Sequence, residues 1–264
     1  MRKIGALLIA RITALWGFEF RRITPRKQFL NLLRSLWPYE SRFELIRVGE
    51  GFDGVYLIPN CLNGNEILIS PGVGTSTSFE LNLHEKFGIP SILIDPTIKQ
   101  PAKSELPPEF VFISKYLGVE DDDKTISLDQ IYRDFGKQKN LILQIDIEGM
   151  EYLSLLCASS ELFNKTKVLV VEFHNLNYWS NLLYYQNVVK PLFDKLNNSF
   201  FPVHLKANSV SGTFKIFGFE VPKVIEMTFI SNSLASKESL VKKLPHPLDV
   251  ANVEGGSLLN FPSV

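Results

Sequence analysis

The chain has 264 residues, 45% of them hydrophobic, and its 28 basic and 28 acidic side chains give a formal net charge of zero. This length and composition suffice for one domain with a sizeable core, and two cysteines are too few for a disulfide scaffold, so we expect a cytoplasmic protein. Residues 1–34 hold eight basic residues and one acidic residue, which leaves 20 basic and 27 acidic residues for the rest. A mildly acidic body without interleaved basic and aromatic residues argues against nucleic acid as a partner.

The first 36 residues predict two helices. Apolar residues recur at helical spacing over 4–20 and over 26–36. The first run contains Arg11 and is too short to span a bilayer, and it lacks the small-residue cleavage site of a signal peptide. Two interpretations of this basic helical extension, residues 1–45, stay open. It is either a packed accessory element or a cationic arm that contacts an anionic membrane surface or a partner, which would make the protein peripheral to a membrane.

Beyond about residue 46, short apolar runs alternate with longer amphipathic segments. The runs predict strands at 66–70, 91–95, 110–113, 141–146, 167–173, 200–206 and 224–230, and the segments predict helices at 77–87, 128–136, 149–159 and 180–197. Such alternation is typical of parallel crossovers in an α/β sheet. Only a loop separates 200–206 from 224–230, which predicts that these two strands pair antiparallel. We therefore expect one α/β domain over 46–264, with a tail from about residue 232.

Residues at the ends of two predicted helices support these bounds. Thr77 with Glu80, and Ser127 with Gln130, have the spacing of a capping box. Gly88 and Gly136 stand where a left-handed residue commonly ends a helix. The sequence thus predicts both ends of the helices over 77–87 and 128–136.

The segment 67–97 predicts a ligand site at the carboxyl edge of the sheet. Gly72 and Gly74 follow a strand, where the absence of a Cβ lets the backbone approach a ligand. Asp95 ends the next strand, about 20 residues on, where a carboxylate can accept hydrogen bonds from both hydroxyls of a ribose. We add the neighbouring Ser70 and Thr97 to this predicted cofactor site. The alternative is that the glycines only turn the chain.

Absent residues narrow the identity of the nucleoside. No third glycine opens the helix at Thr77, which disfavours a dinucleotide, and no Gly-Lys-Ser/Thr run follows, which disfavours a phosphate-binding loop. A cofactor that contains adenosine but no phosphate fits better, and S-adenosyl-L-methionine is the common one. An NAD-linked oxidoreductase or epimerase is a rival interpretation, although the sequence lacks its Tyr-x-x-x-Lys pair.

Several stretches between about 45 and 250 share the motifs of a known family. They are RVGEGFDGVYLIP (47–59), SPGVG with SFELNL, FG and DPT (70–97), TISLDQI (125–131), LILQIDIEGMEYLSLL (141–156), VLVVEFHNL (168–176), HLKANS (204–209), VIEMTFI (224–230) and LPHPLD (244–249). Together they resemble FkbM-type class I S-adenosylmethionine-dependent methyltransferases. The resemblance implies a Rossmann-like, mostly parallel twisted sheet with an antiparallel last strand and helices on both faces. It also implies O-methylation, with a hydroxyl of a saccharide or glycoconjugate as the acceptor.

The sequence departs from the family pattern at several positions. Ser70 replaces the acidic residue that usually holds the methionine amino group in methyltransferases, and Gln144 replaces the lysine before Ile-Asp. Val55, Lys206 and Ser209 replace a glycine, a histidine and an asparagine. These changes keep a second interpretation open, in which the fold is a catalytically silent binding protein for a glycan or a protein partner.

Acidic and imidazole side chains gather where two predicted strands end. Methyl transfer to a hydroxyl requires alignment and a base, and we assign Asp146, Glu148, Glu172 and His174 as the catalytic candidates. Glu148 and Glu151 are three residues apart, which predicts that they share a helix face and raise each other's pKa. For Glu151 we favour the simpler role of stabilising the helix N-terminus. Asp146, Glu148, Glu172 and His174 are also suitable ligands for a divalent cation, preferably magnesium, but no spacing demands a metal.

Further polar and aromatic residues are candidates for contact with the acceptor. The family resemblance suggests Asp53 and Tyr56, and His204 and Asn208 follow the strand 200–206. Tyr178 and Trp179 come directly after the strand 167–173, where their rings can form a wall that stacks on a sugar. The acceptor itself and the oligomeric state are not identified by any residue.

Overall fold

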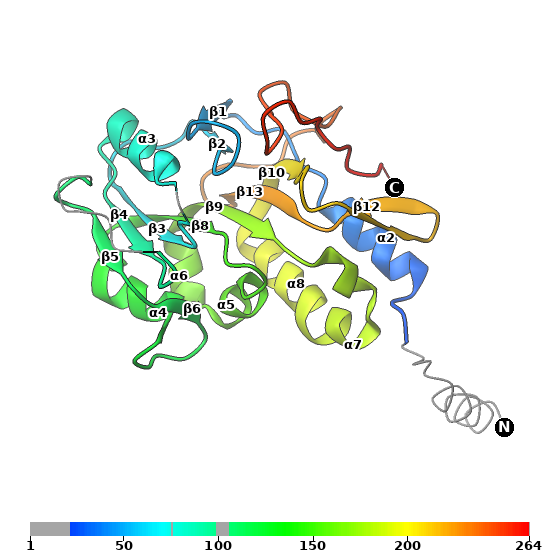
Figure 1. Cartoon of the computed structure of the whole chain (residues 1–264), viewed down its shortest axis with the longest axis horizontal. Helices are drawn as coiled ribbons and strands as arrows, with labels where there is room; N and C mark the ends of the chain where they lie inside the picture. The colour runs from blue at the N-terminus through cyan, green and yellow to red at the C-terminus, as the bar shows by residue number, and fades with distance from the viewer. Residues whose placement is uncertain (1–21, 75, 99–105, 264) are drawn as a thin grey trace.

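The computed structural model describes residues 22–74, 76–98 and 106–263 (Figure 1). The helix predicted over 4–20 lies outside these residues, and the described N-terminal part contains α2, Arg26–Ser35. In the part of the chain that is described, no helix is long and apolar enough to cross a membrane.

A seven-stranded sheet forms the centre of the fold. In spatial order it consists of β10 (Phe200–Ala207), β13 (Ile225–Ser231), β9 (Thr166–Phe173), β8 (Asn140–Ile145), β3 (Glu66–Pro71), β4 (Ser91–Ile94) and β5 (Val111–Ile113). Neighbours from β9 to β5 pair parallel, whereas β13 pairs antiparallel with both β9 and β10. The prediction of an α/β fold with a mostly parallel sheet and an antiparallel last strand is confirmed, and all seven predicted strands are present.

Helices and short strands connect and cover the sheet. The helical elements after α2 are α3 (Ser78–Phe87), α4 (Leu128–Ile131), η1 (Tyr132–Gly136), α5 (Glu151–Cys157), α6 (Ser160–Lys165), η2 (Leu176–Ser180), α7 (Leu182–Tyr184), η3 (Tyr185–Val189) and α8 (Lys190–Ser199). The small sheets are the hairpins β1 (Leu45–Val48) with β2 (Tyr56–Pro59) and β11 (Thr213–Ile216) with β12 (Phe219–Pro222), and the parallel pair β6 (Tyr116–Gly118) with β7 (Thr125–Ser127). The sequence analysis missed these short strands and α6.

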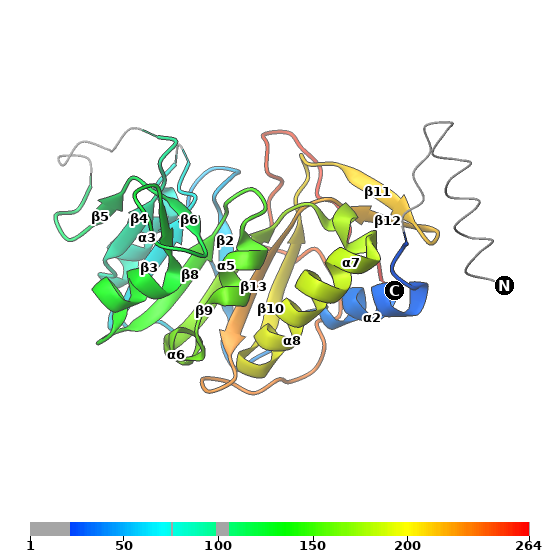
Figure 2. The same ribbon diagram turned by 90° about the horizontal axis from the view of Figure 1, so that it is seen from below.

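The two faces of the sheet are covered differently. Alternate residues of each strand point to opposite faces, so Leu143 and Leu169 join a large core with side chains of α4, α5 and α8. On the opposite face, Leu68 and Ile142 pack against α3 and the β1–β2 hairpin. Figures 1 and 2 show this arrangement, with α4 to α8 on one side of the sheet and α3 and the hairpin on the other. The expectation of helices on both faces thus holds, but one face carries a hairpin beside a single long helix.

Two of the four predicted helix-end residues are confirmed. Ser127 caps α4, because its side chain accepts a hydrogen bond from the Gln130 backbone N–H, and Gly88 ends α3 in the left-handed conformation with φ +68°. The other two assignments were wrong. Thr77 makes no side-chain capping bond to α3, because its backbone, with φ −106° and ψ 20°, lacks the extended conformation of a capping residue. The reciprocal bond is also absent, since the Glu80 side chain points into the core. Gly136 has no positive φ and belongs to η1, where an added Cβ would lie 2.9 Å from the Tyr132 ring.

Both ends of the described chain are tied to the sheet domain. In α2, Phe29 and Leu33 are buried in the same core as the sheet, while Thr24, just before it, donates through its Oγ1 to the Trp179 carbonyl over 2.7 Å. The segment 232–263 is held by Asp249 and Asn252, which bond to His204 and Glu226. The apolar side of α2 is therefore packed, whereas the membrane contact and the division at residue 45 stay predictions.

Candidate functional site

A cavity of about 760 Å³ opens at the carboxyl ends of β3, β4 and β8. Eight of the predicted site residues line it: Asp53, Tyr56, Gly72, Gly74, Asp95, Thr97, Asp146 and Glu148. Its wall also includes the segment Lys115–Gly118, which the sequence analysis did not single out. A cavity of this size at this edge is where open α/β sheets bind ligands.

The two glycines of the first turn serve different purposes. Gly72 has φ +86°, and a Cβ added there would lie 1.6 Å from the Asp146 carbonyl oxygen, so this glycine admits the end of β8 rather than a ligand. Gly74 has φ +61° and no heavy atom within 4 Å of a Cβ position. Because Gly74 faces open space in the cavity, it is the glycine that leaves room for a bound molecule.

Asp95 and the glycine turn meet as the spacing predicted. The Gly74 N–H donates to Asp95 Oδ2 over 3.0 Å, and Thr97 donates to Asp95 Oδ1 through both its N–H at 2.7 Å and its hydroxyl at 2.6 Å. Asp95 is buried. Its carboxylate therefore fixes the shape of the turns after β3 and β4, and three of its roughly four acceptor positions are occupied within the protein.

A chain of buried polar side chains, of which Tyr56, Glu80 and Gln144 line the cavity, forms part of its floor. Ser70 Oγ lies 2.5 Å from Glu80 Oε1 and 2.7 Å from Gln144 Oε1, and Gln144 Nε2 donates to the Tyr56 hydroxyl over 3.1 Å. A hydroxyl has one proton to donate, so the chain is fully satisfied when Glu80 is protonated and donates to Ser70. Burial raises the pKa of Glu80 to about 7, and it raises the pKa of Tyr56 well above its usual range. Glu80 Oε2 has no hydrogen-bond partner among the described residues.

The raised pKa of Glu80 predicts a pH-dependent contribution to stability. Folding raises this pKa from an ordinary value of 4.5 to about 7, so between these values the folded protein keeps a proton that the unfolded chain has lost. The free energy of unfolding therefore falls as the pH rises through this window, by up to about 3 kcal/mol. Above the window the titration of Glu80 lowers it no further.

Glu80→Gln removes this titration and tests the prediction. In urea unfolding, the wild-type protein should lose about 2–3 kcal/mol relative to Glu80→Gln between about pH 5 and about pH 8. Glu85→Gln, on the exposed side of the same helix, should keep the wild-type pH profile. Parallel profiles for the wild-type protein and Glu80→Gln would show that Glu80 does not titrate in this window.

Three catalytic candidates converge where β8 and β9 end. One donor atom from each of Asp146, Glu172 and His174 lies within 4.8 Å of the other two. Burial raises the pKa of Asp146 to about 7, and burial together with the charges of Asp146 and Glu226 raises the pKa of Glu172 to about 9. Burial acts to lower the pKa of His174, but Glu151, Glu172 and Glu148 together raise it above its ordinary value. Asp146 lines the cavity, whereas Glu172 and His174 lie behind it.

The shared helix face predicted for Glu148 and Glu151 was wrong. A turn with φ +57° at Glu148 and φ +117° at Gly149 delays the start of α5 to Glu151. The Glu148 side chain is therefore 89% exposed, while that of Glu151 is fully buried. Glu151 accepts hydrogen bonds from the N–H groups of Gly149 and His174, both over 2.7 Å. Beyond favouring the helix start, Glu151 thus joins the turn after β8 to the end of β9.

His204 and Asn208 do not line the cavity. His204 Nε2 lies 2.9 Å from Asp249 Oδ1 in a buried pair, and Asn208 Nδ2 donates to Glu172 Oε1 over 2.7 Å. Their predicted contact with the acceptor stays a prediction, and for Asn208 a supporting role behind Glu172 is the arrangement seen.

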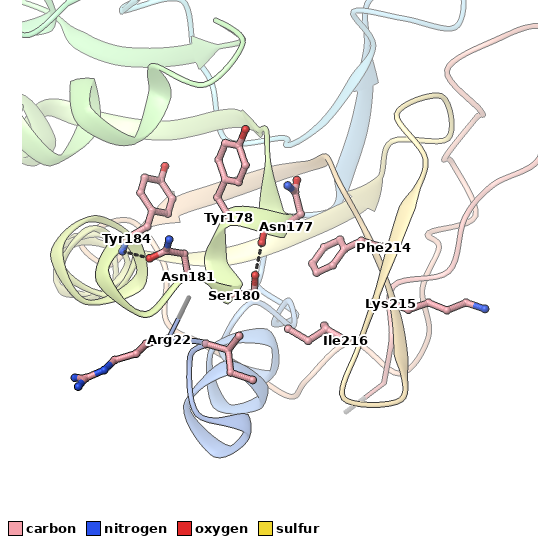
Figure 3. A pocket seen from close by; sticks show the side chains of 10 residues that line it. Arg22, Asn177, Tyr178, Ser180, Asn181, Tyr184, Phe214, Lys215 and Ile216 are labelled. Atoms are coloured by element: carbon pink, nitrogen blue, oxygen red, sulfur yellow. Dashed lines mark hydrogen bonds between the residues drawn. The ribbon is translucent and has the colours of Figure 1, made fainter. Parts of the chain in front are cut away.

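A second cavity of about 560 Å³ lies at the same edge of the sheet, past the end of β9 (Figure 3). Its wall contains aromatic rings, amides and cations: Arg22, Ile23, Asn177, Tyr178, Ser180, Asn181, Tyr184, Phe214, Lys215 and Ile216. Figure 3 shows Arg22 and Lys215 extending outward on opposite sides. The predicted aromatic wall is half present, because Tyr178 is exposed here whereas Trp179 is fully buried in the core, where its Nε1 donates to the Tyr152 hydroxyl.

Glu80 and Gln144 are two buried polar residues of the cavity that were not assigned to the site from the sequence. Glu80 was interpreted as a capping partner of Thr77, although it lies beside Phe79 on the buried side of α3, where an acidic residue is unusual. Gln144 was noted only as a departure from the family pattern. A polar residue within the apolar run of β8 is the pattern that indicates its buried role.

Comparisons with known proteins add little to this geometry. No family model and no curated protein matches the sequence. Among solved structures, the chain is similar to geranyl diphosphate methyltransferase in complex with GPP and sinefungin, with a TM-score of 0.33 and 11% identity over 77% of each chain. It is also similar to a putative riboflavin biosynthesis protein from Shewanella sp. PV-4, with a TM-score of 0.22 and 10% identity over 64% of this chain and 74% of that one. TM-scores this low carry no argument about function, so the proposal below rests on the site itself.

Proposed function

We propose that the protein is an S-adenosylmethionine-dependent methyltransferase of the FkbM type that methylates a hydroxyl of a saccharide or glycoconjugate. The observation that carries the proposal is the bond between Gly74 and Asp95 at the rim of the cavity. It brings the turn after β3 and the carboxylate after β4 together at the edge of the sheet where open parallel sheets bind nucleosides. The mostly parallel sheet with an antiparallel last strand agrees with the same family.

Glu80 supplies a carboxyl group where the family pattern lacks one. Ser70 replaces the usual acidic residue, but Glu80 Oε1 lies 2.5 Å from its hydroxyl, and the unpartnered Oε2 belongs to a residue that lines the cavity. A carboxyl group at this place suits the ammonium of the methionine part. The substitution at Ser70 is therefore compatible with cofactor binding.

Methyl transfer would proceed as an in-line displacement at the cavity. The acceptor oxygen attacks the methyl carbon, the carbon–sulfur bond breaks with its electron pair staying on sulfur, and the hydroxyl proton passes to a nearby carboxylate. Asp146 and Glu148 line the cavity and are the candidates for that carboxylate. The second cavity contains Tyr178, Phe214 and Asn177, whose rings and amide are of the kind that contact a saccharide.

Calorimetric titration with S-adenosylmethionine and with S-adenosylhomocysteine tests the cofactor assignment. We expect one molecule of either ligand to bind per chain. Glu80→Gln should weaken both, because the ligand's ammonium favours the ionised form of the Glu80 carboxyl group and an amide cannot ionise. The same variant should bind 5′-methylthioadenosine as the wild-type protein does, since that nucleoside lacks the amino-acid part. Absence of binding by the folded wild-type protein would contradict the proposal. A screen with methyl-labelled cofactor against sugar and lipid-linked glycan extracts then identifies the acceptor.

The second candidate function is a catalytically silent binding protein on the same fold. Lys206 replaces a family histidine and donates to both carboxylate oxygens of Glu226 at 2.9 and 3.0 Å. It is therefore buried in an internal ion pair and does not face a ligand. Glycan binding without any affinity for S-adenosylmethionine would favour this alternative.

A further inference from the structure

We propose that Asp146, Glu172 and His174 bind one hard divalent cation, of the Mg²⁺ or Mn²⁺ type, at the carboxyl ends of β8 and β9. One donor atom of each residue lies within 4.8 Å of the other two. Ligands at about 2.1–2.4 Å from a common ion lie about 3–5 Å apart. The three side chains are therefore spaced as ligands around one ion, and Asp146 is the one of them that lines the cavity.

The orientation of His174 is an independent observation that points to an ion. Its side chain is only 10% exposed, and its Nε2 lies 3.6 Å from Asp146 Oδ1, which is too long for a hydrogen bond. Nε2 lies equally far, 3.6 Å, from Glu148 Oε2, and no hydrogen bond to Nε2 is formed within the described residues. The other ring nitrogen, Nδ1, faces the fully buried Glu151 at 3.4 Å. Nδ1 makes no hydrogen bond within the described residues, but Glu151 stands beside it where a metal-binding histidine commonly has a carboxylate that fixes its tautomer and ring.

The balance of charge around the cluster also favours a cation. Antiparallel pairing of β13 places Glu226 directly opposite Glu172, which adds a further acidic group. Lys206 is engaged with Glu226, and among the described residues no lysine or arginine forms an ion pair with Asp146 or Glu172. Asn208 donates one neutral hydrogen bond to Glu172. Buried carboxylates of like charge require a shared proton, a protonated neighbour such as His174, or a bound cation, and the spacing of the three donor atoms suits the bound cation.

The catalytic role of the ion rests on the proposed function, whereas the site itself does not. The ion would bind the acceptor hydroxyl next to Asp146 and lower the pKa of that hydroxyl. Glu148 lines the cavity and is not a ligand in this arrangement, so it is left to accept the hydroxyl proton while the methyl group moves to oxygen. The products are the methyl ether and S-adenosylhomocysteine.

Titration of the chelator-treated full chain with Mn²⁺, followed by electron paramagnetic resonance, tests the site. We expect one saturable ion per chain, displaced by Mg²⁺, with affinity reduced at least about tenfold in Glu172→Gln and His174→Gln. Glu85→Gln is the matched control, because it removes an exposed carboxylate of α3 outside the cluster and should leave the affinity unchanged. Circular dichroism establishes that each variant is folded.

Two outcomes would overturn the cation site. One is the absence of saturable Mn²⁺ binding by the wild-type protein at millimolar concentrations, which would indicate a shared proton in place of an ion. The other is equal affinity in the wild-type protein, Glu172→Gln and His174→Gln. Binding of S-adenosylmethionine to the chelator-treated chain is measured by calorimetry in a separate experiment. Failure of the cofactor to bind would contradict the proposed function, but it would not show whether the cation site exists.

Discussion

Gly72→Ala is expected to lower the free energy of unfolding by at least about 3 kcal/mol. The substitution forces a side chain into the backbone at the end of the neighbouring strand β8. An added Cβ would lie 1.6 Å from the Asp146 carbonyl oxygen and 2.5 Å from its carbonyl carbon. Neither neighbour moves easily, since the Asp146 N–H donates to the Pro71 carbonyl over 3.1 Å and the Gly72 N–H to the Ile94 carbonyl over 2.9 Å. Guanidinium unfolding followed by tryptophan fluorescence measures the loss.

Gly74→Ala is the matched control for this substitution. Gly74 also has a positive φ, +61°, but no heavy atom lies within 4 Å of its Cβ position. Its replacement should therefore cost only the left-handed backbone strain, about 1–2 kcal/mol. Equal losses for the two variants would mean that the end of β8 shifts to admit a side chain at position 72.

Asp95→Ala is expected to weaken S-adenosylmethionine binding by about 2–4 kcal/mol, which is roughly 30- to 800-fold. The substitution removes the acceptor of the Gly74 N–H and of both Thr97 donors, so the two turns that line the cavity lose their common anchor. Any bond from the carboxylate to a ribose hydroxyl is lost at the same time. Calorimetric titration measures the change in affinity.

Asp194→Ala serves as the control for Asp95→Ala. Asp194 lies on the exposed surface of α8, pairs with Lys190 and lines neither cavity. Its removal should leave the affinity for S-adenosylmethionine within error of the wild-type value. Wild-type affinity in Asp95→Ala would remove this carboxylate from the cofactor site.

The central strands were predictable from the sequence because burial on both faces makes them continuous apolar runs. The runs that became β3, β8 and β9 are of this kind, and the glycine turn with Asp95 followed from the length of one strand–helix–strand unit. The β1–β2 and β11–β12 hairpins were missed because their strands are only four residues long and cover the sheet or its edge. α6 was missed because Ser159, which caps it, was interpreted as the end of the preceding helix.

Side-chain direction was the part of the site that spacing could not fix. Glu148 and Glu151 share a face only if both are helical, and the positive φ at Glu148 and Gly149 removes that condition. Glu80 has the spacing of a capping residue, yet it points inward to Ser70, because α3 presents that side to the sheet. The direction of each of these side chains depends on which surface its helix or turn packs against. That surface is set by tertiary packing and not by local sequence spacing.

The position of β13 between β9 and β10 constrains how the chain is made. β9 and β10 are synthesised first, but each pairs with β13 and not with the other. Until residues 225–231 have left the ribosome, both strands present open hydrogen-bonding edges, and one side of the nascent sheet is incomplete. Exposed edges of this kind invite pairing with other chains, so β13, the last strand of the sheet in chain order, is the strand that protects these edges from aggregation.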